Sequence, residues 1–168
     1  MIIRPVSSKI DAERLTSFLL DAPQPFATPL TPGEACIVKN DPLESLASAC
    51  KHYFLAEDRD SERLLGVIGA RENQHQTGIY EVTCIAVVPE CRGTGIGKQL
   101  MEHIVEAVKT SGGRGILVDT SDHPDYAPMH RLLRKSGFRE IAHIPEFYYP
   151  GEGTVWYYML LQKDRSVS

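Results

Sequence analysis

The sequence of 168 residues predicts an α/β domain with a mixed sheet and helices on both faces. Two apolar runs, Tyr53 to Ala56 and Leu64 to Ala70, flank a charged stretch and so indicate an antiparallel hairpin. From Val82 onward the pattern becomes strand, glycine-rich turn, helix and strand. A unit of that kind pairs its two strands in parallel through a right-handed crossover. The expected sheet is therefore mostly antiparallel with one parallel strand pair.

The N-terminal part predicts a short strand, Ile2 to Val6, followed by a helix that Ser8 caps. The apolar positions expected on one face of this helix are Ile10, Leu15, Phe18 and Leu19. Asp41-Pro42 combines an N-cap residue with proline at the first helical position, which predicts that a second helix begins there. The proline-rich segment Ala22 to Gly33 is expected to be an irregular surface loop.

The middle of the chain contains the strongest periodic signals. Ile79 to Val88 is the longest strand candidate and is expected to complete an antiparallel meander with the hairpin. An apolar stripe at helical spacing follows, made of Leu100, Met101, Ile104, Val105 and Val108. Gly112-Gly113 is expected to end that helix, and the apolar run Gly115 to Val118 predicts a strand buried on both faces.

The last third predicts one further helix and two strands. The helix runs from Asp125 to Ser136, and the strands are Arg139 to Ile144 and Thr154 to Leu161. No linker clearly divides the chain, so residues 1–163 are expected to form one domain, with 164–168 as a short tail.

Charge and composition argue against several function classes. With 18 Lys+Arg against 22 Asp+Glu the formal net charge is −4, which argues against broad binding to nucleic acid or to anionic membranes. The longest uncharged run, Ala22 to Gly33, is too short and too rich in proline to span a bilayer. The start of the chain lacks a signal-peptide pattern, and its cysteines and histidines show no metal-ligand spacing. We therefore expect a cytoplasmic protein with reduced thiols and no metal.

The most informative segment runs from Val87 to Lys98. Pro89 ends the preceding strand, because proline cannot donate to the ladder. Gly93, Gly95 and Gly97 allow positive φ and close approach of a ligand. A helix is expected directly after them, so its unpaired N–H groups would face whatever the turn encloses. Such a turn binds anions, and phosphate fits it best.

Two common nucleotide-binding motifs do not fit this segment. A P-loop needs Ser or Thr after its Gly-Lys pair, but Gln99 follows Lys98, and Arg92 stands where the first glycine is required. A dinucleotide fingerprint needs its third glycine at Lys98 or Leu100, and neither residue is glycine. A nucleotide-binding domain of either type is therefore disfavoured.

The pattern that does match is Arg92-x-x-Gly95-x-Gly97 after a strand that ends Ile85-Ala86-Val87-Val88-Pro89. It resembles the pyrophosphate-binding motif of the GNAT superfamily of acetyl-CoA-dependent N-acetyltransferases. The order of the elements, and a closing helix that ends Lys135-Ser136-Gly137-Phe138, are also similar to that family. The resemblance covers nearly the whole chain. It implies a GNAT-like fold, acetyl-CoA as the acyl donor, and direct transfer to an amine.

The resemblance also implies where the coenzyme lies. The strand ending at Val87 and the strand starting at Gly115 would part near their C-terminal ends, and the pantetheine arm would enter the gap. Backbone groups of Ile85, Ala86 and Val87 would hydrogen-bond this arm. The turn that would hold the diphosphate consists of Arg92, Gly93, Thr94, Gly95, Ile96, Gly97 and Lys98.

Transfer to an amine needs a base, because a free alkyl ammonium has a pKa of about 10.4. Glu81 is the first candidate, since it shares a strand with the expected acyl site and is expected to share a face with Thr83 and Ile85. A solvated strand carboxylate is the alternative interpretation of Glu81, with equal weight. Asp119 and Glu146 are weaker candidates for the base.

The proton donor for the leaving thiolate is less evident. Many relatives have a tyrosine four residues before the glycine of the closing Gly-Phe, but here that position is Leu133. Tyr126 occupies the position of a coenzyme-contacting asparagine in relatives, so it is expected to contact the coenzyme or to donate the proton. Packing of Tyr126 on the sheet is the alternative. A thiol with a pKa of about 8.5 is a tolerable leaving group without an acid.

Several alternatives stay open from the sequence. A coenzyme A-binding sensor or interaction module is the second functional hypothesis, and Leu133 favours it. The acceptor is a small-molecule or peptide amine of unknown identity, and a homodimer is expected from the resemblance alone. Acidic residues that would suit a cationic acceptor are Asp122, Asp125, Glu146 and Glu152. Aromatic residues that either wall an acceptor pocket or belong to the core and sheet surface are Tyr148, Tyr149, Trp156, Tyr157 and Tyr158.

Overall fold

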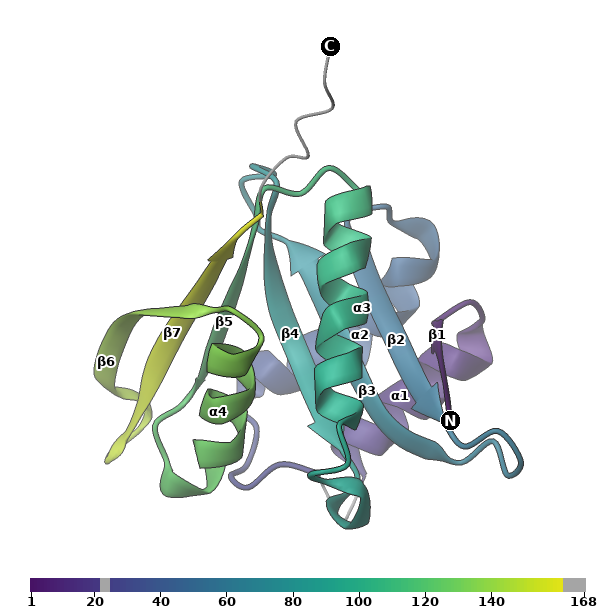
Figure 1. The fold of residues 1–168 in the computed structure, drawn as a ribbon, viewed down its shortest axis with the longest axis horizontal. Helices are drawn as coiled ribbons and strands as arrows, with labels where there is room; N and C mark the ends of the chain where they lie inside the picture. Colours follow the sequence, from purple (N-terminus) through teal and green to yellow (C-terminus); the bar gives the residue numbers. More distant parts are fainter. Residues whose placement is uncertain (22–24, 162–168) are drawn as a thin grey trace.

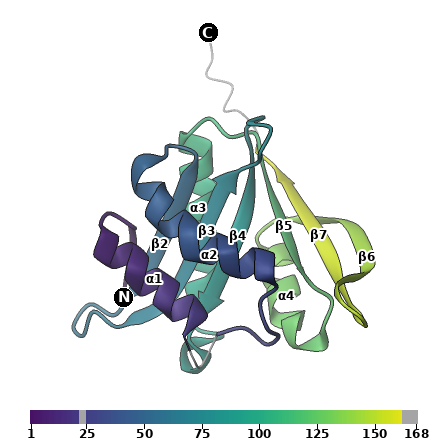
Figure 2. The ribbon, with the colours of Figure 1, turned by 180° about the vertical axis from the view of Figure 1, so that it is seen from behind.

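The computed structural model describes residues 1–21 and 25–161, so the predicted tail at 164–168 and the end of the predicted domain lie outside the described residues. The described chain forms a seven-stranded sheet in the order β1-β2-β3-β4-β5-β7-β6 (Figure 1). Helices α3 and α4 cover one face of this sheet, and helices α1 and α2 cover the other (Figure 2). This arrangement confirms the predicted mixed sheet with helices on both faces.

The elements have the following bounds. The strands are β1 (Ile2–Pro5), β2 (Lys51–Glu57), β3 (Leu64–Glu72), β4 (Ile79–Val87), β5 (Gly115–Ser121), β6 (Arg139–Tyr149) and β7 (Glu152–Leu160). The α-helices are α1 (Lys9–Leu20), α2 (Pro32–Glu44), α3 (Ile96–Thr110) and α4 (Ala127–Lys135). Short 3₁₀ turns are η1 (Ser45–Ala47), η2 (Pro89–Cys91) and η3 (Pro124–Tyr126). The last helix is therefore shorter than predicted, and β6 continues five residues beyond Ile144.

The strand pairing follows the prediction. Strands β2, β3 and β4 form the antiparallel meander, and β4 pairs with β5 in parallel through α3. Strand β5 then pairs with β7, and β7 with the edge strand β6, both antiparallel. Within residues 1–21 and 25–161 no helix is long and apolar enough to cross a membrane.

Helix α2 begins ten residues earlier than predicted. Its N-cap is Thr31, whose hydroxyl accepts from Glu34 N at 3.3 Å, while the Glu34 carboxylate accepts from Thr31 N at 2.7 Å. Pro32 then occupies the first helical position, so this capping box starts the helix. Asp41-Pro42 lies inside the helix, because Asp41 is buried and held by Lys51 at 2.7 Å rather than capping.

The predicted apolar face of α1 is wrong at one position. Ser8 caps the helix as expected, and Leu15 and Leu19 are fully buried, but Ile10 is 68% exposed. The neighbouring Asp11 turns inward instead, since Arg4 binds its carboxylate at 2.7 Å. An ion pair between β1 and α1 therefore sets which face of the helix is buried.

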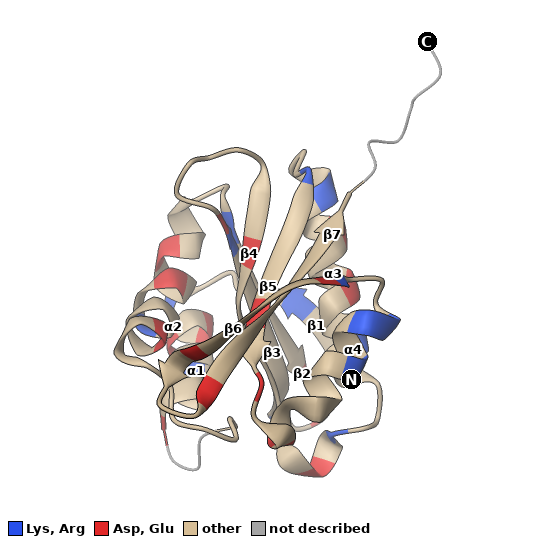
Figure 3. Ribbon diagram, turned by 90° about the vertical axis from the view of Figure 1, so that its left-hand side faces the viewer, with Lys and Arg blue, Asp and Glu red and all other residues tan. Residues whose placement is uncertain are grey.

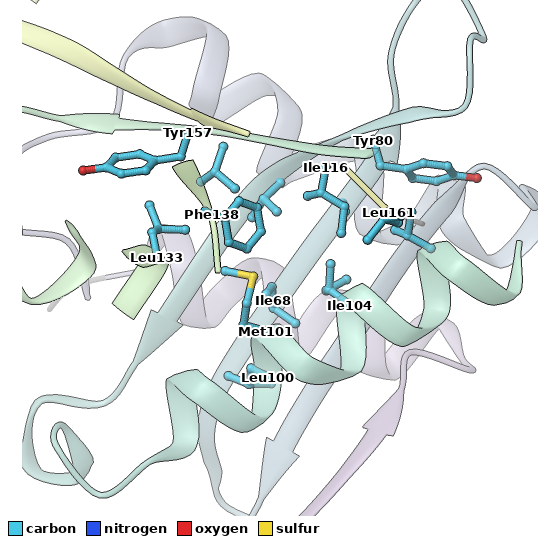
Figure 4. Close-up of a cluster of buried hydrophobic side chains, with 14 of the residues drawn as sticks. Ile68, Tyr80, Leu100, Met101, Ile104, Ile116, Leu133, Phe138, Tyr157 and Leu161 are labelled. Atoms are coloured by element: carbon cyan, nitrogen blue, oxygen red, sulfur yellow. The ribbon is translucent and has the colours of Figure 1, made fainter. Parts of the chain in front are cut away.

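Two apolar cores lie on the two faces of the sheet. On the α3 side, Leu100, Met101, Ile104 and Val108 are fully buried against the sheet, as the helical stripe predicts (Figure 4). The second core lies under α1 and α2 and includes Leu15, Leu19, Val38 and Leu55. Burying such side chains contributes roughly 1.5–3 kcal/mol each, so the two layers fix the sheet between the helices.

A β-bulge in β4 determines which side chains face each core. Gly69 of β3 pairs with Cys84, but the next residue, Ala70, pairs with Val82, so Thr83 is an extra residue in β4. Val82 therefore belongs to the core on the α3 side, whereas Cys84 belongs to the core under α1 and α2. The bulge reverses the alternation of side chains along the second half of β4.

Candidate active site

A cavity of about 770 Å³ opens where β4 and β5 separate. Pairing between these strands ends at Glu81 and Leu117, although β4 continues to Val87 and β5 to Ser121. The cavity is lined by the diverging ends of both strands, the segment from Pro25 to Thr31, the glycine-rich turn, and parts of α4, β6 and β7. The predicted separation of the two strands is thus present.

The glycine-rich turn leaves the start of α3 open to the cavity. Gly93 has φ +79° and Gly95 has φ +93°, and a Cβ at either position would meet no atom within 4 Å. Gly95 is the N-cap of α3 and supplies no side chain, so no side-chain hydrogen bond caps the helix. The first N–H groups of α3 therefore remain available to an anion, which the helix dipole also favours.

Arg92 and Lys98, the two basic residues predicted in the turn, make different contacts. Arg92 donates from Nε to Val87 O at 3.2 Å and from Nη2 to Pro25 O at 2.6 Å, so it joins the turn to the loop before α2. Lys98 lies on the exposed surface of α3, 3.6 Å from Glu102. The Thr94 hydroxyl donates to Cys91 O at 2.7 Å and braces the turn. Both basic side chains line the cavity.

The second half of β4 presents unpaired main chain to the same cavity. Ile85, Ala86 and Val87 pair with β3 on one side, and no pairing with β5 exists on the other among the described residues. All three residues line the cavity. Main-chain groups that lack a strand partner are strong hydrogen-bonding sites for an extended ligand.

Tyr126 reaches the cavity from η3, at the start of α4. Its hydroxyl lies 3.2 Å from Thr28 Oγ1, and Thr28 also donates to Glu152 Oε1 at 3.1 Å. Glu152 in turn accepts from the Ser121 hydroxyl at 2.5 Å. The loop before α2 is thus fixed on one side by Tyr126 and Glu152 and on the other by Arg92.

A second cluster of polar side chains in the cavity joins β5 to β6 through hydrogen bonds that span β7. The Tyr148 hydroxyl donates to Asp119 Oδ2 at 2.5 Å and accepts from Thr154 Oγ1 at 3.3 Å. Burial, together with the neighbouring Asp119 charge, raises the pKa of Tyr148 well above its usual range. Figure 3 marks acidic positions on β4, β5 and β6 and basic ones on α4.

The structure places other predicted residues away from the cavity. Glu81 is not among the described residues that line it. Its carboxylate faces Arg71 at 3.9 Å, on the side of α2. The expected shared face of Glu81 and Ile85 is wrong, because the bulge at Thr83 turns Ile85 toward the core on the α3 side. Glu146 accepts from Gly151 N at 3.0 Å in the β6–β7 turn and is likewise outside the lining.

Leu133 is fully buried in the core on the α3 side, and the described residues that line the cavity do not include it. Its neighbours Met129 and Leu132 line the cavity instead. Of the five late aromatic residues, Tyr148 and Tyr149 line the cavity, whereas Tyr157 is a fully buried core residue. The core interpretation is therefore confirmed for Tyr157, and an acceptor-pocket role for Tyr148 and Tyr149 stays a prediction.

Sequence reasoning missed Thr28 and gave little weight to Asp119 and Tyr148. Thr28 lies in a loop without periodicity, and its contacts join residues about a hundred positions apart. Asp119 offered one usable signal, since it lies near the C-terminal end of a strand in a parallel pair, where ligands of such sheets bind. Among the described residues, no group of His, Cys, Asp and Glu could hold a metal ion.

The family model of the GNAT acetyltransferases matches residues 19–138 of this sequence. The chain belongs to the acetyltransferase (GNAT) family. No curated protein sequence matches it significantly. As a member of this family it is an acyltransferase, and the matched region contains β4, the glycine-rich turn, α3 and β5.

Solved structures of GNAT proteins share the whole fold. A protein assigned to the GNAT family from Desulfovibrio desulfuricans matches with a TM-score of 0.78 and 25% identity, over 95% of this chain and 98% of its own. An aminoglycoside 6'-N-acetyltransferase complexed with coenzyme A matches with a TM-score of 0.73 and 18% identity, over 98% and 100%. A protein from Salmonella typhimurium in complex with acetyl-CoA gives 0.72 and 16%, over 100% and 98%.

The cavity of this GNAT protein fits the chemistry of acetyl-CoA. A diphosphate requires an uncapped helix N-terminus beside cationic side chains, and both are present at Gly95 and Arg92. Pantetheine carries amides that pair with exposed strand backbone, which the second half of β4 supplies. Of the predicted coenzyme residues, Thr94 and Ile96 are not among the described residues that line the cavity. Those that line it are Ile85 to Val87, Arg92, Gly93, Gly95, Gly97, Lys98 and Tyr126.

Proposed function

We propose that this chain is an N-acetyltransferase that transfers the acetyl group of acetyl-CoA directly to an amine of a small molecule or peptide. One observation carries the proposal: a single cavity joins the uncapped start of α3 to strand backbone left unpaired between β4 and β5. The first feature suits a diphosphate, and the second suits an extended arm that carries amides. Acetyl-CoA contains both, in that order along its length.

In this proposal the chain's backbone does most of the binding. N–H groups of Ile96 and its neighbours bind the diphosphate, with Arg92 and Lys98 beside them. Backbone groups of Ile85 to Val87 orient the arm so that the thioester carbonyl meets an N–H donor. A donor of this kind contributes about 3–4 kcal/mol to stabilising the transition state.

Side chains are proposed to move the protons. Tyr126, whose hydroxyl lies in the cavity beside Thr28, donates a proton to the departing sulfur or holds the coenzyme near it. Glu81 accepts a proton from the amine through water. Its carboxylate is part-exposed and lies outside the lining of the cavity, so direct contact with the amine is not part of this role.

The test is release of free thiol from acetyl-CoA in the presence and absence of a panel of primary amines. We expect faster release with at least one amine and recovery of the N-acetyl product by mass spectrometry. Gly95→Glu, which places a carboxylate in the turn, should lose both activity and coenzyme binding. Tight acetyl-CoA binding with no acceleration by any amine would contradict the proposal.

A coenzyme A-binding sensor is the second candidate, because Leu133 places no hydroxyl in the cavity at the position where relatives carry their tyrosine. The same assay distinguishes the two, since a sensor binds the coenzyme without amine-dependent thiol release. A cytoplasmic location and a homodimer belong to the first proposal. Their tests are cell fractionation and the mass of the protein in solution.

A further inference from the structure

Two carboxylates line the β5–β7 side of the cavity. Asp119 lies on β5, and Glu152 begins β7. Glu152 is engaged by the hydroxyl groups of Ser121 and Thr28. The partner of Asp119 in the described chain is the Tyr148 hydroxyl at its Oδ2 atom, and its Oδ1 atom has no hydrogen-bond partner there.

This pairing differs from that of the chain's most buried carboxylates. Asp11 binds Arg4 at 2.7 Å, Asp41 binds Lys51 at 2.7 Å, and Glu57 binds Arg14 at 2.6 Å. Each of these charges is compensated by a cation, which offsets the cost of removing it from water.

Neither Asp119 nor Glu152 forms an ion pair with a cationic side chain of the described residues. The cations that line the same cavity, Arg92, Lys98, Arg131 and Lys135, lie on the glycine-rich turn, α3 and α4 and make no such contact. The half-buried Asp119 carboxylate therefore favours a cation brought by a ligand.

Tyr148 fixes the direction of the Asp119 carboxylate. Its hydroxyl accepts from Thr154, a fully buried residue, and donates to Asp119. Because both functions of the hydroxyl are used, the phenol cannot rotate without losing one bond. Asp119 Oδ2 is thereby held by Tyr148 of β6, while Asp119 lines the cavity and its Oδ1 has no hydrogen-bond partner among the described residues.

We propose that Asp119 binds the ammonium group of the acceptor and that Tyr148 is the positioning residue that aligns its carboxylate. This inference rests on the proposed acetyl transfer and names the group that selects the acceptor. It assigns the acceptor to amines that arrive as cations, such as aliphatic mono- and diamines, in preference to arylamines that are neutral at the same pH. Charge-assisted hydrogen bonding to Asp119 Oδ1 supplies the preference.

The experiment compares a cationic acceptor, putrescine, with a neutral one, aniline, at neutral pH. For Asp119→Asn we expect kcat/KM with putrescine to fall about tenfold to a hundredfold, mainly through KM. With aniline the change should stay within about threefold, and the Kd of acetyl-CoA should not change. Tyr148→Phe should raise KM for putrescine in the same direction, by about threefold to tenfold.

Asp122→Asn is the matched control. Asp122 lies just beyond β5, binds His143 Nε2 and Gly153 N, and is not among the described residues that line the cavity. Its substitution should leave the preference for putrescine unchanged. Equal losses with both acceptors in Asp119→Asn, or an unchanged ratio between them, would overturn the role of Asp119. An unchanged KM for putrescine in Tyr148→Phe would overturn the positioning role.

Binding separates this inference from the proposed reaction. Calorimetric titration of the coenzyme A-loaded protein with putrescine and with butanediol measures charge selectivity without turnover. We expect putrescine to bind more tightly, and Asp119→Asn to abolish the difference. Equal binding of the two compounds by the wild type would overturn the inference even if acetyl transfer occurs. Failure of every amine to accelerate thiol release would instead count against the proposed function.

Discussion

The hydroxyl groups of Tyr53 and Thr83 lie 2.7 Å apart, across the full width of β3. Tyr53 is buried, and its ring lies over Gly69, where a Cβ would come within 2.0 Å of the ring. Glycine at that position therefore lets the tyrosine of β2 reach the bulge of β4. The hydrogen bond ends on Thr83, the extra residue of the bulge and part of the cavity wall.

Removing this hydroxyl should disturb the cavity more than the fold. For Tyr53→Phe we expect kcat/KM for acetyl transfer to fall about fivefold to tenfold, because one hydrogen bond of about 1 kcal/mol no longer holds the bulge. Thr83→Val should have the same effect, and the double variant should lose little more than either single one. Thr83→Ser, which keeps the hydroxyl, is the control. Wild-type kinetics in both Tyr53→Phe and Thr83→Val would contradict this role.

Gly95→Glu should abolish acetyl-CoA binding, because a carboxylate would project into the turn that receives the diphosphate. Gly112→Glu is the matched control. Gly112 also has positive φ, at +77°, with open space around it, but it lies at the opposite end of α3. Both substitutions introduce a similar backbone strain of about 1–2 kcal/mol. Calorimetric titration should show lost affinity in Gly95→Glu alone, and equal losses in both would refute the anion-binding turn.

Glu81→Gln tests the proposed base. We expect a lower kcat, an unchanged Kd of acetyl-CoA, and loss of the acid limb of the pH–rate profile, because that limb reports titration of the base. Asp119→Asn should behave differently and act through KM of a cationic acceptor. A wild-type pH–rate profile in Glu81→Gln would remove this residue from the mechanism.

Leu133→Tyr should destabilise the protein instead of supplying a proton donor. Leu133 is fully buried in the core on the α3 side, so a larger ring overpacks that core by about 1–3 kcal/mol. Leu133→Met, which nearly conserves volume, should cost less than about 1.5 kcal/mol. Denaturant unfolding measures both. A stable Leu133→Tyr variant with raised kcat would show that the new hydroxyl reaches the cavity.

Asp11 should make stability depend on pH in the acid range. The Arg4 side chain holds the pKa of Asp11 well below its usual range, so the folded state retains the carboxylate where the unfolded state binds a proton. This contribution is complete above the unfolded pKa of about 3.9 and is lost as pH falls through the folded pKa.

Asp11→Asn should therefore cost about 1–3 kcal/mol near neutral pH, since the Arg4 guanidinium loses one of the two carboxylates that it binds. The difference from wild type should shrink below about pH 4. Glu13→Gln on the exposed side of α1, where Lys9 is 3.6 Å away, is the control and should change little. A difference that stays constant down to the acid transition would contradict the linkage.

Elements with strong periodicity could be predicted from the sequence. The stripe from Leu100 to Val108 and the glycines of the turn defined α3 and the coenzyme side of the cavity, because local chemistry determines both. Elements whose start or buried face depends on long-range ion pairs could not be predicted from the sequence. Asp41 followed by proline is typical of a helix start, but here Asp41 lies inside α2 and forms an ion pair with Lys51. Ile10 is exposed because Asp11 turns toward Arg4.

The acceptor side of the cavity was harder to predict for the same reason. The face to which Ile85 points depends on Thr83 being an extra residue, and the alternation of polar and apolar residues does not reveal a bulge when every residue from Cys84 to Val88 is apolar. Asp119 on β5 and Tyr148 on β6 are separated by β7 in the sheet order, so their hydrogen bond spans β7. Their pairing is a property of topology, which local spacing does not encode.

The single unpaired residue in β4 sets how this strand tolerates insertions and deletions. Removing Thr83 would leave Cys84 and every later residue of the strand in its present layer, because the pairs Gly69–Cys84 and Ala70–Val82 would then be consecutive. Removing one residue after Cys84 would instead move the side chains that follow it to the opposite layer. The exposed turn around Asp60, between β2 and β3, has no alternation of side chains between two cores to preserve. Length variation among close homologues should therefore be tolerated in that turn and at position 83, while the residue count between Cys84 and Val87 stays constant.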